Sequence, residues 1–125
     1  MSSTVIAPAN GNKSLTAGVY NVIYIAPLDC VSATVNFRLI SRGLTQNIKT
    51  RIAIVPNGFI DGSATPPPNN TWIAPIDIIL GPNGVTSGII EDTAIVLSPG
   101  ETIIAYVDAD LVTARVHGLI RTIGA

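Results

Sequence analysis

The stretch "VSATVNFRLIS", residues 31–41, decides the fold class of this 125-residue chain. Its apolar residues Val31, Ala33, Val35, Phe37 and Leu39 fall on one side, and serine, threonine, asparagine and arginine alternate with them on the other. A period of two places successive side chains on opposite faces of a β-strand. The stretch therefore predicts a strand with one buried face and one solvent-facing face.

The segments on either side repeat this pattern between turn residues. Val, Ile and Thr dominate, and 11 glycines and 9 prolines cut the chain into short pieces. Branched side chains favour strands over helices, and we find no convincing helical stripe in any window of twelve residues. Further strands are expected over residues 19–26, 48–55, 72–80, 102–107 and 112–120, with an edge or bulge at Pro75. Residues 85–97 are expected to hold two short strands. A short N-terminal piece over residues 4–7 is expected to stop at Pro8, before the loop "NGNKS".

Eight or nine short strands at about ten-residue spacing predict one all-β domain over residues 1–125, an antiparallel β-sandwich with jelly-roll-like order. Residues 1–14 are expected to form an N-terminal arm. Residues 61–70, "DGSATPPPNN", are expected to form an exposed loop, because three consecutive prolines remove three donors from a strand ladder. This loop is either a plain connector or an arm that reaches a neighbouring subunit.

Charge and hydropathy exclude several classes of partner. Charged residues make up 12% of the chain, about half the usual share for a soluble domain. The net charge is −1 and there is no basic run, so a nucleic-acid partner is not expected. No signal peptide and no apolar run of about 18 residues are visible, so a membrane partner is not expected either.

The stretch "YVDADLVTARVHG", residues 106–118, gathers Asp108, Asp110, Arg115 and the single histidine, His117. An aspartate is readily accepted in a β-turn because its side chain bonds nearby backbone donors. A calcium site would need six to eight oxygen ligands, and no third carboxylate is close in the sequence. We therefore interpret the aspartates as turn residues and His117 as a half-exposed or interface side chain.

Catalytic chemistry finds little support. Cys30 is the only cysteine, so it forms no internal disulfide, and as a nucleophile it would need His117 beside it. Zinc needs several Cys or His ligands. Glu91 and Asp92 are adjacent and would point to opposite faces of a strand, which does not suit a glycosidase pair. We expect no enzyme activity, no catalytic residue, no cofactor and no metal.

Some predicted strands are apolar on both faces, which is unusual for a sandwich strand with one face in water. The outer faces are covered either by loops of the chain itself or by other subunits of a homo-oligomer, for which a trimer is favoured. Trp72 is expected to cover the core after the proline-rich loop. The candidate interface residues are Tyr20, Tyr24, Ile104, Tyr106, Pro66, Pro67 and Pro68.

Three segments carry a resemblance to a known group of proteins. They are "GVYNVIYIAPLDCVSATVNFRLISRG", "RIAIVPNG" and "GIIEDTAIVLSPGETIIAYVDADLVTARVHGLI", with the matching positions at 23–27, 33–43, 51–55 and 95–118. The order resembles the small β-sandwich accessory virion proteins of tailed bacteriophages, over about two-thirds of the chain. The chain departs from them at "SRG", where "NRG" is expected, and in the proline-rich insert at 61–70.

The resemblance implies a structural role in the virion, assembled in the host cytoplasm. The expected function is a capsid decoration or cement protein whose partner is the phage major capsid protein. The alternative is a tail or tail-fibre component, either an adaptor or a protein that binds a host receptor. No catalytic residue carries over from the group.

Overall fold

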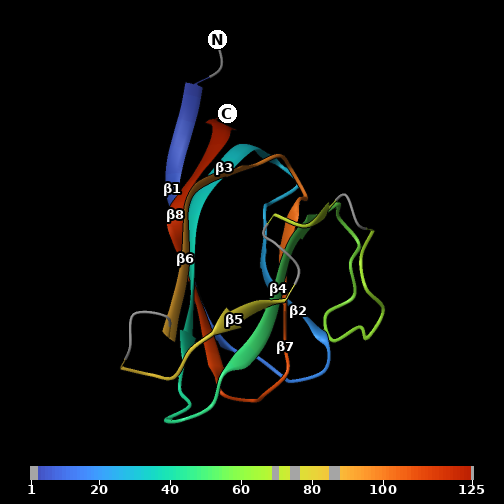
Figure 1. The fold of residues 1–125 in the computed structure, drawn as a ribbon. Helices are drawn as coiled ribbons and strands as arrows, with labels where there is room; N and C mark the ends of the chain where they lie inside the picture. Colours follow the sequence, from blue (N-terminus) through green and yellow to red (C-terminus); the bar gives the residue numbers. More distant parts are fainter. Residues whose placement is uncertain (1–2, 69–70, 74–76, 85–87, 125) are drawn as a thin grey trace.

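The computed structural model describes residues 3–68, 71–73, 77–84 and 88–124, and this part of the chain contains eight strands. They form two four-stranded antiparallel sheets packed face to face (Figure 1). The first sheet has the order β1-β8-β3-β6 and the second sheet the order β2-β7-β4-β5. The strands are β1 (Ser3–Ser14), β2 (Tyr20–Ile25), β3 (Cys30–Ser41), β4 (Ile48–Val55), β5 (Ile78–Leu80), β6 (Ile89–Leu97), β7 (Thr102–Val107) and β8 (Val112–Gly124).

This strand order is that of a double-sheet jelly roll. Successive strands lie in alternate sheets everywhere except at β4 and β5, which are neighbours in the second sheet. A sheet with one apolar face must bury that face against another layer, and here each sheet serves as the other's cover. The predicted all-β, jelly-roll-like sandwich is confirmed.

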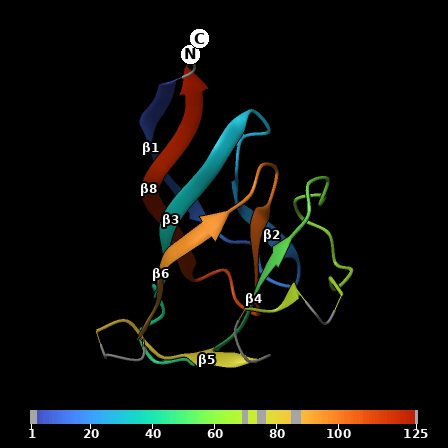
Figure 2. The ribbon, with the colours of Figure 1, turned by 90° about the horizontal axis from the view of Figure 1, so that it is seen from above.

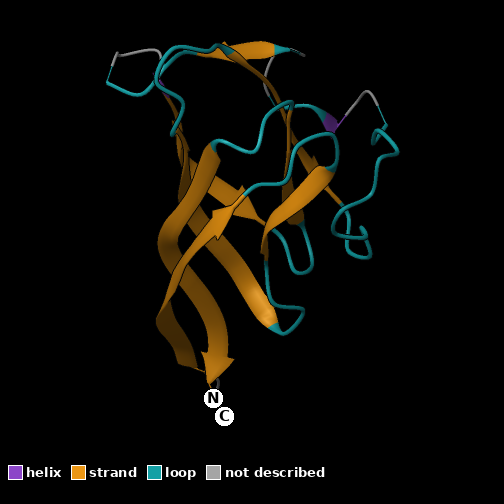
Figure 3. Cartoon of the chain, turned by 90° about the horizontal axis from the view of Figure 1, so that it is seen from below, coloured by secondary structure: helices purple, strands orange, loops and turns teal. Residues whose placement is uncertain are grey.

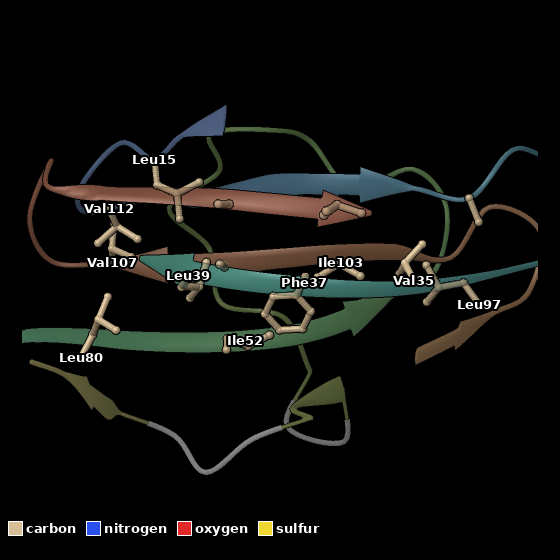
Figure 4. Close-up of a cluster of buried hydrophobic side chains, with 14 of the residues drawn as sticks. Leu15, Val35, Phe37, Leu39, Ile52, Leu80, Leu97, Ile103, Val107 and Val112 are labelled. Carbon is tan, nitrogen blue, oxygen red and sulfur yellow. The ribbon is translucent and has the colours of Figure 1, made fainter. Parts of the chain in front are cut away.

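The main core lies between the two sheets. Val35, Phe37 and Leu39 of β3 are fully buried there, as the alternation predicts. Figure 4 shows them together with Ile52 of β4 and Ile103 of β7 among the side chains that fill this space. The outward residues of β3 are polar or only partly buried, so the first sheet has one buried face and one solvent-exposed face.

The alternation on β3 breaks at the start of the strand. The register between β3 and β8 shifts between Cys30 and Ser32, which marks a β-bulge. As a result Cys30 is buried as a free thiol, and Val31 is exposed. The prediction that Val31 belongs to the buried face was wrong for this reason.

The N-terminal strand is much longer than predicted. β1 runs through Pro8 and the "NGNKS" stretch and pairs continuously with β8, from Ser3 opposite Gly124 to Ser14 opposite Thr113. A proline is tolerated here because β1 is an edge strand with one neighbour. The two ends of the chain consequently lie together (Figure 2), and the expected arm is part of the first sheet.

Two other predicted segments differ from the structure. Two short strands were predicted in 85–97; residues 89–97 form the single strand β6 with a register shift, and residues 85–87 lie outside the described residues. Among the described residues of the predicted strand 72–80, Ile78–Leu80 forms a strand and Trp72 makes an isolated bridge to Ala53. The expected irregularity at Pro75 lies outside the described residues.

Candidate interaction surfaces

The outer face of the second sheet is covered by the chain itself. Residues 56–68 and 71–73, named here the covering loop, lie on that side of the sheet (Figures 1 and 3). Their side chains Phe59 and Trp72 pack against a second apolar cluster that contains Tyr20 and Ile104. The Tyr20 ring centroid is 6.5 Å from that of Phe59 and 6.1 Å from that of Trp72. Of the two predicted ways to cover this face, the loop is the one that the structure contains.

The coverage corrects the expected role of two candidate interface residues. Ile104 is 0% exposed and Tyr20 is 1% exposed in the single chain. Neither side chain is accessible to a second subunit. The sequence shows that these strands are apolar on both faces, but it does not show that a loop far along the chain returns to cover one of them.

Tyr106 lies at the border of the covered cluster and is half-buried. The Arg51 guanidinium carbon is 5.3 Å from the Tyr106 ring centroid. Arg51 also donates to Asp77 Oδ1 at 2.7 Å and to the Tyr20 hydroxyl at 3.2 Å. The hydrogen bond from Arg51 lowers the pKa of Asp77, and the bond to Asp77 raises the pKa of Arg51. The charged and aromatic side chains around Tyr106 therefore already interact with one another within the single chain.

Tyr24 follows a register shift in β2 and packs against the main core from the side. Its hydroxyl is buried and has no hydrogen-bond partner among the described residues. Burial raises the pKa of Tyr24, with a smaller contribution from Cys30. The side chain is partly exposed, so it remains accessible at the rim of the sandwich.

The proline-rich part of the covering loop borders a hollow. Pro66 and Pro68 are exposed and Pro67 is buried. The three prolines line a hollow of about 410 Å³ together with Phe59 and Ile60. Pro66 and Pro68 are therefore the members of this trio that remain available to a partner. Asn69 and Asn70, the end of the predicted loop, lie outside the described residues.

A salt bridge holds the covering loop to the edge of the first sheet. Lys13 of β1 donates to Asp61 Oδ2 at 2.9 Å and to the Val22 carbonyl at 2.8 Å. Burial acts to raise the pKa of Asp61, but the hydrogen bonds from Lys13 and from the Val22 N–H outweigh it and lower that pKa. Lys13 was expected in a loop, so this link could not be predicted from the sequence.

The two aspartates of the "DAD" stretch bind backbone amides of distant segments. Asp108 accepts from the Lys49 N–H at 2.8 Å, and Asp110 accepts from the Ala17 N–H at 2.6 Å. They therefore fasten the β7–β8 connection to the start of β4 and to the turn before β2. Within the described residues, no three Asp, Glu, His or Cys side chains gather at a distance suited to a metal ion.

The outer face of the first sheet, named here the open face, has no covering loop among the described residues. His117 lies exposed on it, in line with Arg115 and Leu119 of β8. Cys30 points to the opposite, buried side of the same sheet. The geometry therefore separates the thiol from the histidine, and the two do not form a nucleophile and base.

Large apolar side chains remain exposed at both ends of the open face. Val96 of β6 is 66% exposed and Leu119 of β8 is 52% exposed, and both lie beside Thr34 in register. Ile89 is exposed toward the other end, beside Ile40. Sequence reasoning missed these residues, although Leu119 continues the alternation of Arg115 and His117.

Comparison of the chain with protein-family models, with curated proteins and with solved structures finds no match. The described residues contain no helical segment with the length and hydropathy of a membrane span.

Proposed function

We propose that this chain is a structural protein of a bacteriophage particle, a capsid decoration protein that binds the major coat lattice and stabilises it. The observation that carries the proposal is the difference between the two outer faces. On the second sheet the covering loop buries Tyr20 and Ile104 and leaves Ile79 exposed at the β5 edge. On the open face Val96, Leu119 and Ile89 are all exposed to solvent. Exposed apolar side chains around polar groups are typical of surfaces that bind another protein.

The open face has the dimensions of a protein interface. Four strands at about 4.8 Å spacing, with ten residues at about 3.3 Å each, cover roughly 600 Å². A stable interface buries about 800 Å² on each partner. The open face therefore supplies about three-quarters of that area, and adjoining loops are needed for the rest.

Self-association is part of the proposal, with a trimer favoured. With Ile104 and Tyr20 buried, the contact falls on the covering loop, where Pro66, Pro68 and Ile60 are exposed. Several copies joined in this way would each present an open face to the coat. The resulting avidity would exceed the affinity of one copy without any new kind of contact.

Cryo-electron microscopy of the phage particle that contains the chain tests the proposal. We expect density on the head lattice, with the first sheet toward the shell, in particles assembled in the host cytoplasm. Density on the tail would overturn the decoration role in favour of a tail or fibre component. Absence of the chain from purified particles would overturn both.

A matched pair of variants tests which face attaches. Leu119→Asp places a charge on the open face and should reduce binding to capsids at least about tenfold. Ile25→Asp places the same charge on an exposed residue of β2, outside both the open face and the covering loop, and should leave capsid binding unchanged. Equal losses in both variants would contradict attachment through the open face.

A further inference from the structure

A row of charges crosses the middle of the open face. Arg38 of β3 lies directly opposite Glu91 of β6 on one side and Arg115 of β8 on the other. Arg38 donates to Glu91 from Nε at 2.9 Å and also from Nη2. Arg115 is exposed and has no ion pair with any described residue. Like charges directly opposite each other destabilise a sheet, so the row lacks one negative charge.

A chain of hydrogen bonds orients the histidine beside this row. β6 carries a bulge at which Ala94 has a left-handed φ of 57°, a conformation that is uncommon for any residue with a side chain. The Ala94 N–H donates to Asn36 Oδ1 at 2.8 Å, which leaves the Asn36 Nδ2 amide facing His117 Nε2 at 3.2 Å. In this arrangement a neutral His117 accepts at Nε2 and carries its proton on Nδ1.

These side chains line one hollow of about 420 Å³, which is formed by Arg38, Ile40, Arg115 and His117. Guanidinium groups have donors and no acceptor, and the remaining N–H of His117 is also a donor. With Arg121, the open face carries three arginines and one glutamate, a net charge of +2. The chain as a whole carries −1, so the rest of it carries −3. The donors that line the hollow and the positive charge of the open face favour the binding of an oxyanion.

We propose that this hollow is a seat for a carboxylate, provided by an acidic side chain of a bound protein. One uncompensated arginine matches one carboxylate charge, and the planar guanidinium of Arg115 suits bidentate binding of a carboxylate. The seat lies open on a sheet face, so it receives a group presented from another surface. This inference goes beyond the proposed function, because the isolated chain carries the seat whether or not it binds a capsid.

NMR titration of the isolated protein with acetate tests the chemistry of the seat. We expect saturable shifts of the Arg115 Nε–Hε and His117 ring signals, with Kd on the order of millimolar. Sodium chloride at equal ionic strength should leave these signals in place. Arg115→Gln should weaken acetate binding about five- to tenfold. Arg121→Gln removes the same charge from the same face of β8 and should change it less than twofold.

Asn36→Ala tests the orienting chain of hydrogen bonds. The ¹⁵N shifts of the His117 ring should report a proton on Nδ1 in the wild type and a mixture of tautomers in the variant. Acetate should then bind about twofold to threefold more weakly. An unchanged tautomer in Asn36→Ala would overturn the role given to Asn36.

A blocked peptide with one glutamate identifies the source of the carboxylate. It should bind as tightly as acetate or more tightly, and the same peptide with glutamine should not bind. Binding of acetate without the glutamate peptide would overturn a protein side chain as the occupant. Saturable binding of inorganic phosphate in place of acetate would overturn the carboxylate, and equal losses in Arg115→Gln and Arg121→Gln would overturn the seat itself.

Discussion

Ile104 lies at the centre of the second sheet, opposite Val22 of β2 and Ala53 of β4. Its side chain is fully buried beneath the covering loop. Truncating a buried isoleucine removes its transfer free energy and leaves a cavity. A position that the sequence pattern offers as a subunit contact is therefore a determinant of the stability of the single chain.

We expect Ile104→Ala to lower the free energy of unfolding by about 2–5 kcal/mol. Ile60→Ala, at a residue that is 76% exposed, should change it by less than about 0.5 kcal/mol. Urea denaturation followed by circular dichroism measures both. Equal stability of the two variants would contradict the burial of Ile104 by the covering loop.

Gly118 is required where β8 passes close to β3. A Cβ built at this position would lie 2.1 Å from the Thr34 carbonyl oxygen and 2.7 Å from the Val35 Cα. Both neighbours are backbone atoms, so they give way only if the strands move apart. The sequence contains the glycine but does not reveal that β8 and β3 come this close at that position.

Gly118→Ala should cost about 1–3 kcal/mol of unfolding free energy. The matched control is Gly11→Ala in β1, where an added Cβ meets no atom within 4 Å. This control should be neutral or slightly stabilising, because alanine restricts the unfolded chain. Thermal melts of the two variants compare them directly, and a Gly118→Ala melt at the wild-type temperature would refute the close approach.

At the scale of elements, the covering loop is fastened to β1 by Lys13 and Asp61. The pKa of Asp61 is lowered in the folded chain, so its contribution to stability is present above about pH 4. That contribution is lost as the pH falls through the lowered folded value. Asp77, whose pKa is lowered beside Arg51, acts in the same direction and in the same window.

Asp61→Asn should therefore reduce the loss of stability between pH 5 and about pH 3. Both partners are partly exposed, so the cost at neutral pH should be below about 1 kcal/mol. Melting temperatures across this range measure the effect. Asp29→Asn, at an exposed aspartate without a hydrogen bond to the described residues, is the control and should keep the wild-type acid slope.

At the scale of the whole molecule, the covering loop leaves fewer surfaces for self-association than the strand pattern implies. Ile60, Pro66 and Pro68 border one exposed hollow, which places the proposed subunit contact there. A charge in an apolar contact has no partner and is costly to bury.

Light scattering at tens of micromolar should detect a homo-oligomer, with a trimer expected. Ile60→Asp should shift it toward monomer and leave the circular dichroism spectrum and melting temperature close to those of the wild type, because Ile60 is outside both cores. A monodisperse wild-type monomer would contradict self-association. A trimer that is unaffected by Ile60→Asp would show that the subunit contact lies outside the covering loop.

The sequence by itself determines that this chain is all-β and that β3 buries Val35, Phe37 and Leu39. A period of two follows from the local stereochemistry of an extended backbone, so it is readable without knowing any neighbour. The same holds for the turn residues, which end most strands close to where they were predicted to end.

Only the tertiary structure decides which faces are covered and which residues meet. β1 extends through Pro8 because β8 offers it twelve partners, and Ile104 is buried because the covering loop returns over it. The open face joins Arg38 and Arg115, which are far apart in the chain, through the pairing of β3 with β8. Loop paths and strand pairing depend on contacts across the whole chain, and no local pattern of side chains records them.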